Sequence, residues 1–360
     1  MSTLRSLSRC FAATAMLALA ALSQAGTDLT ALRKEADAAW KARDFTACAD
    51  LFGKVTAAAA DDAVAWHHLG YALHSLGKLD EALAAHERCA SLFPKEPATT
   101  RLGTYNIACI LAMKGERDRA LTALELAVER GFRRDAFMLR DADLAGVRDD
   151  PRFQQLIERI VKSRLQVAVV VHDGVELLDF AGPAEVFASA RKDGEPLCRV
   201  FLVAPGKAPV TSQGFVKLQA NFAIDDCPRP DVIVIPGGDT GVLQRDDRFL
   251  DWVKTNMPTT KVLLTVCTGA FVPAQLGLLD GKEATTHHGS LAALQQRHPK
   301  VKVRSDTKVV DNGAIVTSAG VSSGIEGSLH VMARLCGDDV ATGVARYIEY
   351  RWEPAAAEKR

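Results

Sequence analysis

The sequence has no excess of charge of either sign, because 44 basic residues balance 44 acidic residues over 360 positions. A chain without a basic surplus lacks the electrostatic footprint of a nucleic-acid binder, so we expect no nucleic-acid partner. The glycines follow neither the G-x-G-x-x-G nor the P-loop spacing, and the cysteines form neither a C-x-x-C pair nor a zinc pattern. We therefore expect no nucleotide, flavin or metal cofactor.

Long apolar runs are also absent, since the run at 10–22 is short for a membrane span. Arg5 and Arg9 precede this run, and residues 23–25 (SQA) offer small side chains at the −3 and −1 positions of a cleavage site. Residues 1–25 therefore predict a signal peptide. We expect export to the periplasm of a Gram-negative-type bacterium and no membrane span after cleavage, with a retained N-terminal anchor as the alternative.

Cysteine and histidine are the residue types that could carry metal or thiol chemistry. One cysteine leaves with the signal peptide, and an odd number remains, so at least one thiol stays free or pairs between chains. The remaining seven are Cys48, Cys89, Cys109, Cys198, Cys227, Cys267 and Cys336. Most are expected to be buried singly. Four histidines in the first half are expected to be solvated or packed rather than metal ligands: His67, His68, His74 and His86.

The segment 63–96 has the residue spacing of a 34-residue tetratricopeptide repeat, in which small residues let two antiparallel helices approach closely. Weaker copies of the pattern precede it at 44–55 and follow it at 105–131. We predict an all-α repeat domain over 30–131, then a capping helix and linker over 132–163. The resemblance to tetratricopeptide repeats implies a protein or peptide partner, and a structural spacer or dimerisation arm is the alternative.

After about Gln166, apolar runs of strand length alternate with helical patterns. This alternation predicts an α/β domain over 165–352, with a doubly wound parallel sheet covered on both faces, and a tail over 353–360. The strand candidates are 166–172, 198–205, 231–238 and 261–266, with shorter ones at 284–288, 301–305 and 314–320, and 209–221 reads as a hairpin. The helical candidates are 182–194, 246–257, a helix from Cys267 onward, 322–336 and 338–352.

Ligands bind such sheets at the carboxyl ends of the strands, where Cys267 follows an apolar run and opens a helical pattern. Backbone amides at a helix start favour a thiolate, although a buried cysteine can equally be packing. Gly237 and Gly238 end another strand and could form an oxyanion hole or an ordinary turn. Gly320 ends a third strand.

Asp179 lies after the first apolar run, between Leu178 and Phe180. An acid in that setting needs a hydrogen-bond partner, or it caps a helix that starts near Pro183. Glu176 is a competing carboxylate. His287 ends a short strand candidate twenty residues after the cysteine, where it could assist a nucleophile or bond to backbone.

Together and in this order, these residues resemble the ThiJ/PfpI (DJ-one) superfamily, whose members have glutamine-amidotransferase-like, flavodoxin-type folds. The resemblance covers about 165–352. It rests on LLDFAGPAEVF, VIVIPGG, VCTGAFVPAQLGLLDGKEATTHH and VTSAGVSSGIEGSLHVM. The Cys-Thr-Gly elbow and the aspartate before Gly-Pro are similar to the branch that contains isonitrile hydratase and the amidase-like domains of AraC-type regulators.

The resemblance implies that Cys267 is the nucleophile and that Asp179 is hydrogen-bonded to its sulfur. A protonated carboxyl would donate to the thiolate and lower the thiol pKa below about 8.5. Thr268 would hold substrate or donate through its amide, beside the amides of Gly237, Gly238 and Gly320. His287 matches a histidine that lies near the thiol in other branches. Because Thr268 stands where protease-like members have histidine, peptidase activity is disfavoured.

The resulting hypothesis is an exported, cysteine-dependent enzyme of hydratase or hydrolase type, acting on a small electrophilic substrate. Its repeats over 30–131 would bind a protein partner, and the chain could form a homodimer. One alternative is a redox- or stress-sensing protein whose thiol is oxidised. The other is a non-catalytic module that binds a ligand or a partner.

Overall fold

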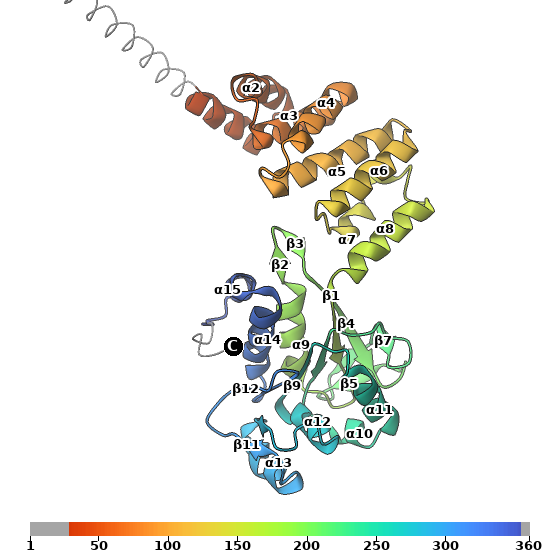
Figure 1. Ribbon diagram of the computed structural model, residues 1–360, viewed down its shortest axis with the longest axis vertical. Coiled ribbons are helices and arrows are strands. Elements are labelled where there is room, and N and C mark those ends of the chain that lie inside the picture. Colours follow the sequence, from red (N-terminus) through yellow and green to blue (C-terminus); the bar gives the residue numbers. More distant parts are fainter. Residues whose placement is uncertain (1–28, 354–360) are drawn as a thin grey trace, which may run out of the picture. The chain divides into compact units, whose positions relative to one another are not determined.

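The computed structural model describes residues 29–353, so the predicted signal peptide and nearly all of the predicted tail lie outside the described residues. The chain divides between Ile160 and Val161 into two compact units. The first is helical and the second is built around a sheet (Figure 1). None of the helices among the described residues combines the length and the apolar composition that crossing a membrane requires.

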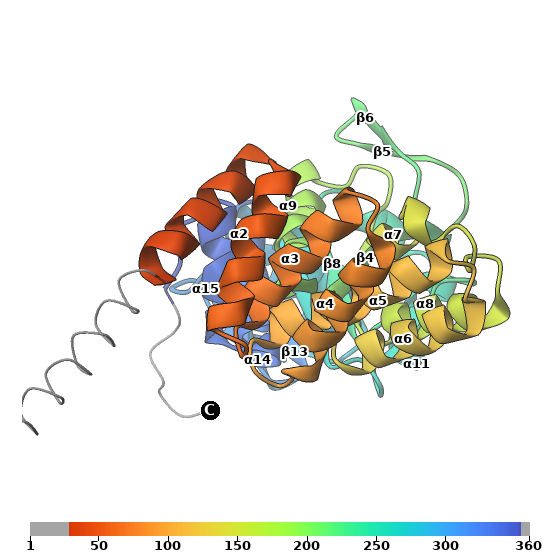
Figure 2. The ribbon, with the colours of Figure 1, turned by 90° about the horizontal axis from the view of Figure 1, so that it is seen from above.

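The helical unit is a series of short helices in which neighbours in sequence are neighbours in space. Figure 2 shows α3 beside α4 and α5 beside α6, and these pairs are in contact. Residues 29–42 form its first helix. The other elements are α2 (Phe45–Ala58), α3 (Ala63–Ser75), α4 (Leu79–Ser91), α5 (Pro97–Met113), α6 (Arg117–Glu129), α7 (Asp135–Met138), the 3₁₀ turn η1 (Ala142–Leu144) and α8 (Pro151–Lys162).

Local sequence explains where these helices begin and end. Asp44 and Asp62 precede α2 and α3, and each carboxylate accepts a 3.0 Å hydrogen bond from a backbone amide of the first turn. Gly77 and Gly115 follow α3 and α5 with φ of +73° and +78°, a conformation that glycine adopts at least cost. Gly70 lies so close to the His86 ring that an added Cβ would be 2.7 Å from it. The small residue therefore permits the close helix contact that the repeat pattern predicts.

The segment predicted as cap and linker, 132–163, contributes to the core of the helical unit. Phe132, Met138 and Phe153 are fully buried in one cluster with Tyr105 of α5. The Phe132 and Tyr105 rings stack with centroids 4.4 Å apart. The helical unit therefore continues to Ile160, which is also buried in this cluster.

The second unit contains a seven-stranded sheet in the order β12-β13-β9-β8-β1-β4-β7. All neighbouring strands pair in parallel except β12 and β13, which are antiparallel. Its strands are β1 (Leu165–Val170), β4 (Cys198–Ala204), β7 (Phe222–Ala223), β8 (Val232–Ile235), β9 (Val262–Val266), β12 (Val309–Asp311) and β13 (Ile315–Ser318). The smaller pairs are β2 (Arg191–Lys192) with β3 (Glu195–Pro196), β5 (Val210–Ser212) with β6 (Val216–Leu218), and β10 (Glu283–Ala284) with β11 (Lys302–Val303).

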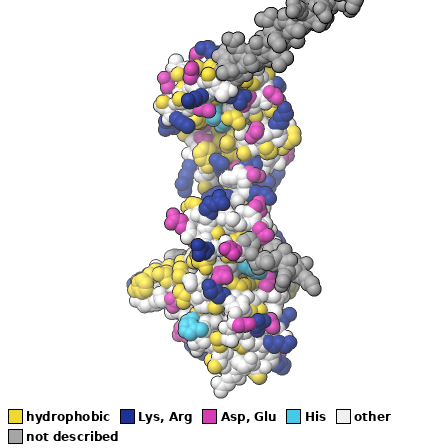
Figure 3. All heavy atoms as spheres, turned by 90° about the vertical axis from the view of Figure 1, so that its left-hand side faces the viewer, with side chains coloured by type: hydrophobic (Ala, Val, Ile, Leu, Met, Phe, Trp, Pro, Cys, Tyr) yellow, Lys and Arg dark blue, Asp and Glu magenta, His cyan; other side chains and the backbone are white. Residues whose placement is uncertain are grey.

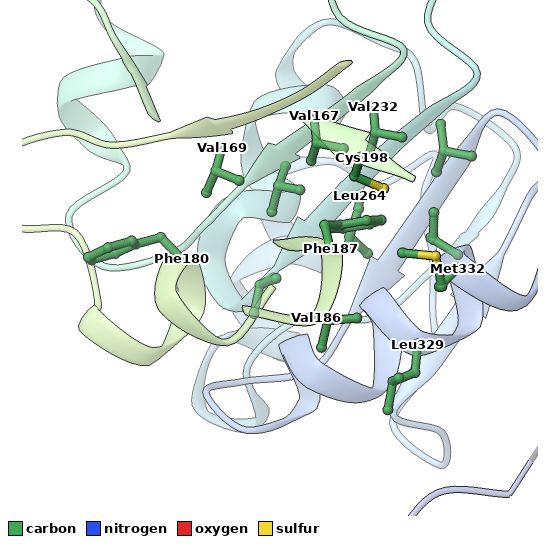
Figure 4. Close-up of a cluster of buried hydrophobic side chains, with 14 of the residues drawn as sticks. Val167, Val169, Phe180, Val186, Phe187, Cys198, Val232, Leu264, Leu329 and Met332 are labelled. Carbon is green, nitrogen blue, oxygen red and sulfur yellow. The ribbon is translucent and has the colours of Figure 1, made fainter. Parts of the chain in front are cut away.

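Helices cover both faces of this sheet, as expected for apolar strands without an alternating polar face. One layer contains α9 (Leu177–Ala188), α14 (Ser323–Cys336) and α15 (Asp338–Tyr347). In Figure 4, Phe187 of α9 and Met332 of α14 lie in one cluster with Val167 and Leu264 of the strands. The other layer contains α10 (Gly241–Gln244), α11 (Asp247–Asn256), η2 (Cys267–Ala270), α12 (Phe271–Gln275), η3 (His288–Ser290) and α13 (Leu291–Arg297). The doubly wound α/β prediction is confirmed.

The structure differs from the predicted elements in several places. The helix expected from about residue 182 begins at Leu177, because Pro183 removes only one helical hydrogen bond and its ring lies against Gly324 of α14. The strand expected over 284–288 is limited to Glu283–Ala284, since the Thr285 amide donates to the Thr317 hydroxyl and the Thr286 hydroxyl donates to the Cys267 carbonyl. The helix expected from Cys267 begins as a 3₁₀ turn.

Two surface features agree with the sequence. On the face drawn in Figure 3, basic and acidic side chains are interspersed, as the balanced composition predicts. The predicted hairpin over 209–221 is present as the antiparallel pair β5–β6, which projects from its unit in Figure 2.

Candidate active site

The candidate site lies where β1, β8, β9 and β13 end at the carboxyl edge of the sheet. Cys267 directly follows β9 and has φ of +57°, a left-handed conformation that is strained for any residue with a side chain. Its amide donates to the Ala319 carbonyl at 3.0 Å, and its carbonyl accepts from Thr286 Oγ1 at 2.7 Å. Since neighbouring segments fix both backbone groups, the fold maintains the strain and holds the thiol on a sharp corner.

The corner also depends on a close backbone contact next to it. At Gly269, an added Cβ would lie 2.1 Å from the Ile235 carbonyl oxygen. Only glycine permits this approach of the corner to the end of β8. The glycine of the Cys-Thr-Gly motif is therefore a steric requirement of the turn.

Asp179 reaches the same corner from the first turn of α9. The side chain is completely buried, and its Oδ2 accepts a 2.9 Å hydrogen bond from the Gly237 amide. Its Oδ1 has no partner that meets full hydrogen-bond geometry, although the Cys267 thiol and the Val321 amide lie close enough to affect its pKa. The capping alternative is wrong, because Glu176 holds the N-cap position and Asp179 lies within the helix.

The two acidic groups shift each other's ionisation. Burial raises the pKa of Asp179 to about 6, against the lowering effect of the hydrogen bonds from Gly237 and Cys267. Burial, followed by the Asp179 charge, raises the pKa of the Cys267 thiol to about 12. The prediction of a thiol pKa below about 8.5 is therefore wrong. The cause is that a 7% exposed sulfur gains little from water while it faces a carboxylate.

A raised thiol pKa does not make the pair inert, because the two groups titrate together. Between about pH 6 and pH 12 the pair holds a single proton. When that proton lies on the sulfur, the carboxylate is charged, and when it lies on Asp179 the sulfur is a thiolate. The amides of Thr268 and Val321 lower the pKa of the sulfur and so favour the second arrangement.

The two glycine amides predicted to form an oxyanion hole have other partners in the structure. The Gly237 amide donates to Asp179, and the Gly238 amide donates to Thr268 Oγ1 at 3.1 Å, so both are already used within the protein. The amides that face the sulfur belong to Thr268 and Val321. The predicted donor role of Thr268 thus has structural support, while the two glycines act as positioning residues.

Val321 is the site residue that sequence reasoning missed. It lies just beyond β13 with φ of +53°, which is unusual for a β-branched residue. Its amide faces both the Asp179 carboxyl and the Cys267 sulfur. The available signal was its position directly after Gly320, at the end of a predicted strand.

Thr268 joins the elbow to the glycine turn. Its hydroxyl donates to the Gly238 carbonyl at 3.0 Å and accepts from the amide of the same residue. At Gly237, an added Cβ would meet Asp179, Cys267 and Thr268, each at 2.7 Å. A glycine at this position therefore permits all three side chains to meet.

His287 lies beside the site without joining the pair. Its Nδ1 accepts a 3.2 Å hydrogen bond from the Gly289 amide, and an added Cβ at Gly320 would lie 2.3 Å from its ring. Within residues 29–353, it makes no hydrogen bond with Cys267 or Asp179. Gly320 thus makes room for the imidazole. Glu176, the competing carboxylate, accepts from Gln213 and raises the pKa of Asp179.

The seven cysteines of the described residues are all unpaired. Cys198 lies in the same core cluster as Cys267 and is buried to a similar extent, at 8% against 7% exposed. The backbone of Cys198 is not left-handed. No carboxyl group among the described residues forms a hydrogen bond with its thiol. Burial alone therefore does not distinguish the candidate nucleophile, but its backbone and its partner do.

Residues 165–334 match the DJ-1/PfpI family, and residues 63–96 match the tetratricopeptide repeat. Isonitrile hydratase from Pseudomonas putida is 34% identical over 194 residues, which are 53% of this chain and 80% of that protein. The transcriptional regulator CdhR from Pseudomonas aeruginosa is 24% identical over 48% of this chain and 51% of its own length. A crystal structure of a ThiJ/PfpI family protein from Pseudomonas syringae is 27% identical, with a TM-score of 0.48 over 54% of this chain and 79% of that one.

The chain therefore belongs to the DJ-1/PfpI family and carries a tetratricopeptide repeat before its family domain. The family match of 165–334 spans the segments that supply Asp179, Gly237, Cys267 and Val321. The recognition made from sequence is confirmed at the level of family and fold.

Proposed function

We propose that this protein is an exported, cysteine-dependent enzyme of hydratase type, which adds water to a small electrophilic substrate of the isonitrile class. The observation that carries the proposal is the Cys267 thiol on a left-handed corner beside the buried Asp179 carboxyl, with two amides facing the sulfur. The similarity to isonitrile hydratase supplies the substrate class. The small exposure of the thiol, 7%, favours a small substrate.

The proposed reaction uses the shared proton twice. The Cys267 thiolate forms a bond to the terminal carbon of R–NC, and the proton held by Asp179 moves to that carbon, giving the thioimidate R–N=CH–S–Cys. Water then forms a C–O bond at the same carbon, with one proton moving to nitrogen. The C–S bond breaks, and the second proton of the water returns to the pair. The sum is R–NC + H₂O → R–NH–CHO, in which Asp179 acts first as acid and then as base.

Turnover of n-butyl isonitrile to the N-substituted formamide, followed by NMR, tests this proposal. We expect Cys267→Ala to fall to the uncatalysed rate and Asp179→Asn to lose about 10²–10³-fold in kcat/KM. Cys198→Ala removes a thiol of similar burial from the same core and should retain turnover within about threefold. Full turnover in Cys267→Ala, or no turnover by the unsubstituted protein, would refute the proposal.

The redox-sensing alternative has a different signature. It requires rapid oxidation of Cys267 by hydrogen peroxide, while the raised thiol pKa predicts slow oxidation in the protein without substrate. Mass spectrometry after brief peroxide exposure would detect sulfenic or sulfinic acid at this position. Fast oxidation combined with an absence of isonitrile turnover would replace the enzymatic proposal by the sensing one.

Export forms part of the proposal and rests on the n-region, apolar run and small residues of 1–25. Expression of the full chain in a Gram-negative host, followed by fractionation and N-terminal sequencing, tests it. We expect a periplasmic protein that begins at Gly26. A cytoplasmic protein that retains its first residues would contradict export.

Partner binding by the repeats is supported by the tetratricopeptide match. Tyr71 of α3 is exposed and lines a cavity of the helical unit, which makes it a suitable position for a photocrosslinking residue. Tyr347, exposed on α15 of the other unit, is the matched control. We expect a defined crosslinked protein from position 71 and none from position 347. The same products from both positions would contradict specific binding.

A further inference from the structure

The helical unit contains a second cluster of reactive side chains, far in sequence from the cysteine corner. The Cys109 thiol of α5 and the carboxylates of Asp141 and Asp143 bring their ligand atoms within 4.8 Å of one another. The His74 imidazole of α3 approaches the same group, since its Nε2 lies 3.4 Å from Asp143 Oδ2. These four side chains come from α3, α5 and the η1 segment, so the cluster spans three elements.

All four line one cavity of about 460 Å³ within the helical unit. His67, which the sequence analysis expects to be solvated or packed, also lines this cavity, and its buried Nδ1 has no hydrogen-bond partner among the described residues. A buried imidazole nitrogen without a partner is costly, and a cation or its bound water is the kind of ligand that would satisfy it. This observation is independent of the carboxylates and points to the same cavity.

We propose that this cavity binds a divalent transition-metal ion, Zn²⁺ foremost, through Cys109, Asp141, Asp143 and His74. One thiolate, one imidazole and two carboxylates form a donor set that suits zinc better than Mg²⁺ or Ca²⁺, which take oxygen ligands alone. The site lies outside the DJ-1/PfpI domain and is unrelated to the proposed hydration reaction.

The spacing of the donors supports a tetrahedral ion. Zinc–ligand distances of about 2.0–2.3 Å place neighbouring ligand atoms about 3.3–3.8 Å apart. Cys109 Sγ lies 3.7 Å from Asp141 Oδ2, and His74 Nε2 lies 3.4 Å from Asp143 Oδ2. These two pairs already have the separation of tetrahedral edges, and the ligand atoms of Cys109, Asp141 and Asp143 lie within 4.8 Å of one another, so rotation of the His74 side chain toward them would complete the set.

Neighbouring groups orient the donors as outer-shell residues orient metal ligands. The Tyr105 hydroxyl donates to Asp141 Oδ2 at 2.6 Å, and the Asp143 amide donates to Asp141 Oδ1 at 3.1 Å. Each carboxylate oxygen keeps a further lone pair for a metal. A cation between Cys109, Asp141 and Asp143 would relieve the repulsion between two carboxylates whose oxygens lie within 4.8 Å of each other.

Charge balance also fits a divalent ion. A thiolate and two carboxylates carry three negative charges, of which Zn²⁺ would neutralise two. Arg134 lines the same cavity and can offset the remaining charge. Methionine sulfur is a further soft neighbour, because Met113 Sδ lies 3.2 Å from His74 Nε2.

Cobalt titration of the full chain, after treatment with a chelator, tests the proposal. We expect one equivalent of Co²⁺ to give a near-ultraviolet thiolate-to-metal absorption, which Zn²⁺ then abolishes by displacement. Cys109→Ser should remove this absorption, and Asp143→Asn should weaken binding at least about tenfold. Cys89→Ser is the matched control, because Cys89 is equally buried in the same unit but bonds to backbone carbonyls. Asp118→Asn is the matched control for the carboxylate, since that side chain is almost fully exposed.

Thermal unfolding gives a second test of zinc binding, one that does not depend on any single variant. At about a hundredfold excess over the dissociation constant, Zn²⁺ should raise the unfolding temperature of the unsubstituted protein by about 5–10 °C. The Asp143→Asn protein should show a smaller rise at the same zinc concentration. No thiolate absorption, or an absorption that survives Cys109→Ser and disappears in Cys267→Ala, would overturn the proposal.

Discussion

The helical unit and the α/β unit use left-handed backbone for different purposes. In the helical unit, Gly77 and Gly115 end helices, and no atom lies within 4 Å of an added Cβ at either position. In the α/β unit, Cys267 and Val321 carry side chains at positive φ, and Gly238 lies in contact with the backbone of another segment. At Gly77 and Gly115 the left-handed backbone ends a helix at little cost, whereas at Cys267 and Val321 it places a thiol and an amide beside a carboxyl.

The largest expected effect concerns a glycine at the site. Gly238→Ala would place a Cβ 2.2 Å from the Gly174 carbonyl oxygen at a φ of +99°, so we expect a loss of about 3–5 kcal/mol in unfolding free energy and loss of activity. Gly77→Ala, with open space around it, should cost about 1 kcal/mol. Hydrogen exchange measured peptide by peptide reports each unit separately. Equal losses at the two positions would remove the distinction between the units.

The second prediction concerns the cost of the buried carboxyl. Burial raises the pKa of Asp179 from 3.8 to about 6, so the folded state binds a proton that the unfolded state has released, and ionisation destabilises the fold as pH rises through this window. Asp179→Asn should therefore be more stable than the unsubstituted protein at pH 8 by up to about 3 kcal/mol, and by much less at pH 4.5. Urea unfolding at the two pH values measures the difference.

Asp62→Asn gives the control for this prediction in the other unit. Asparagine caps a helix as well as aspartate does, so the stability of this variant should change by less than about 0.5 kcal/mol at either pH. An Asp179→Asn protein whose stability advantage is the same at pH 4.5 and pH 8 would show that the carboxyl does not ionise in the fold.

Some elements of the molecule are determined by the sequence of the element itself, and others depend on distant contacts. Apolar runs predict β1, β4, β8 and β9, and repeat spacing predicts α3 and α4, because these patterns depend on neighbours within about one element. The early start of α9 was missed, since the contact between Pro183 and Gly324 that stabilises it joins residues 141 positions apart.

The site was predictable in part. Strand ends and the family resemblance indicated Cys267, Asp179 and Thr268, but not the amide of Val321 or the direction of the thiol pKa. Both depend on how segments after β9 and β13 meet α9. Burial of the sulfur and its distance from the carboxyl are properties of that packing, and no local pattern encodes them.

The third prediction compares the reactivity of two buried thiols against pH. Since the Cys267 pair releases its first proton near pH 6, alkylation of Cys267 by iodoacetamide should rise through about pH 6 and then level off. In Asp179→Asn the thiol has neither a carboxyl partner that ionises near pH 6 nor the carboxylate charge that raises its pKa, so the plateau should disappear and the rate should keep rising with pH above 7. Peptide mass mapping follows each thiol separately.

Cys198 provides the internal reference in the same samples. Burial raises its pKa strongly and it has no carboxyl to share a proton with, so it should remain slow at pH 7 in both proteins. If the two thiols follow the same pH curve, the corner is a packing feature and the hydratase proposal loses its main support.

The smallest expected effect concerns helix capping, for which we expect the same loss of stability in both units. Asp62 caps α3 and Asp246 caps α11, through hydrogen bonds of 3.0 and 3.1 Å to backbone amides. Replacement of either by alanine should cost about 1 kcal/mol, as measured by hydrogen exchange in the helix concerned. A loss confined to one unit would show that helix capping, too, depends on the surrounding architecture.

The unpaired state of all seven cysteines between residues 29 and 353 has a consequence for how the chain reaches its native form. No oxidative step separates the newly made polypeptide from the folded one, so folding requires neither an oxidant nor an isomerase that reshuffles sulfur bonds. The covalent structure of this part of the chain is consequently the same in a reducing and an oxidising compartment.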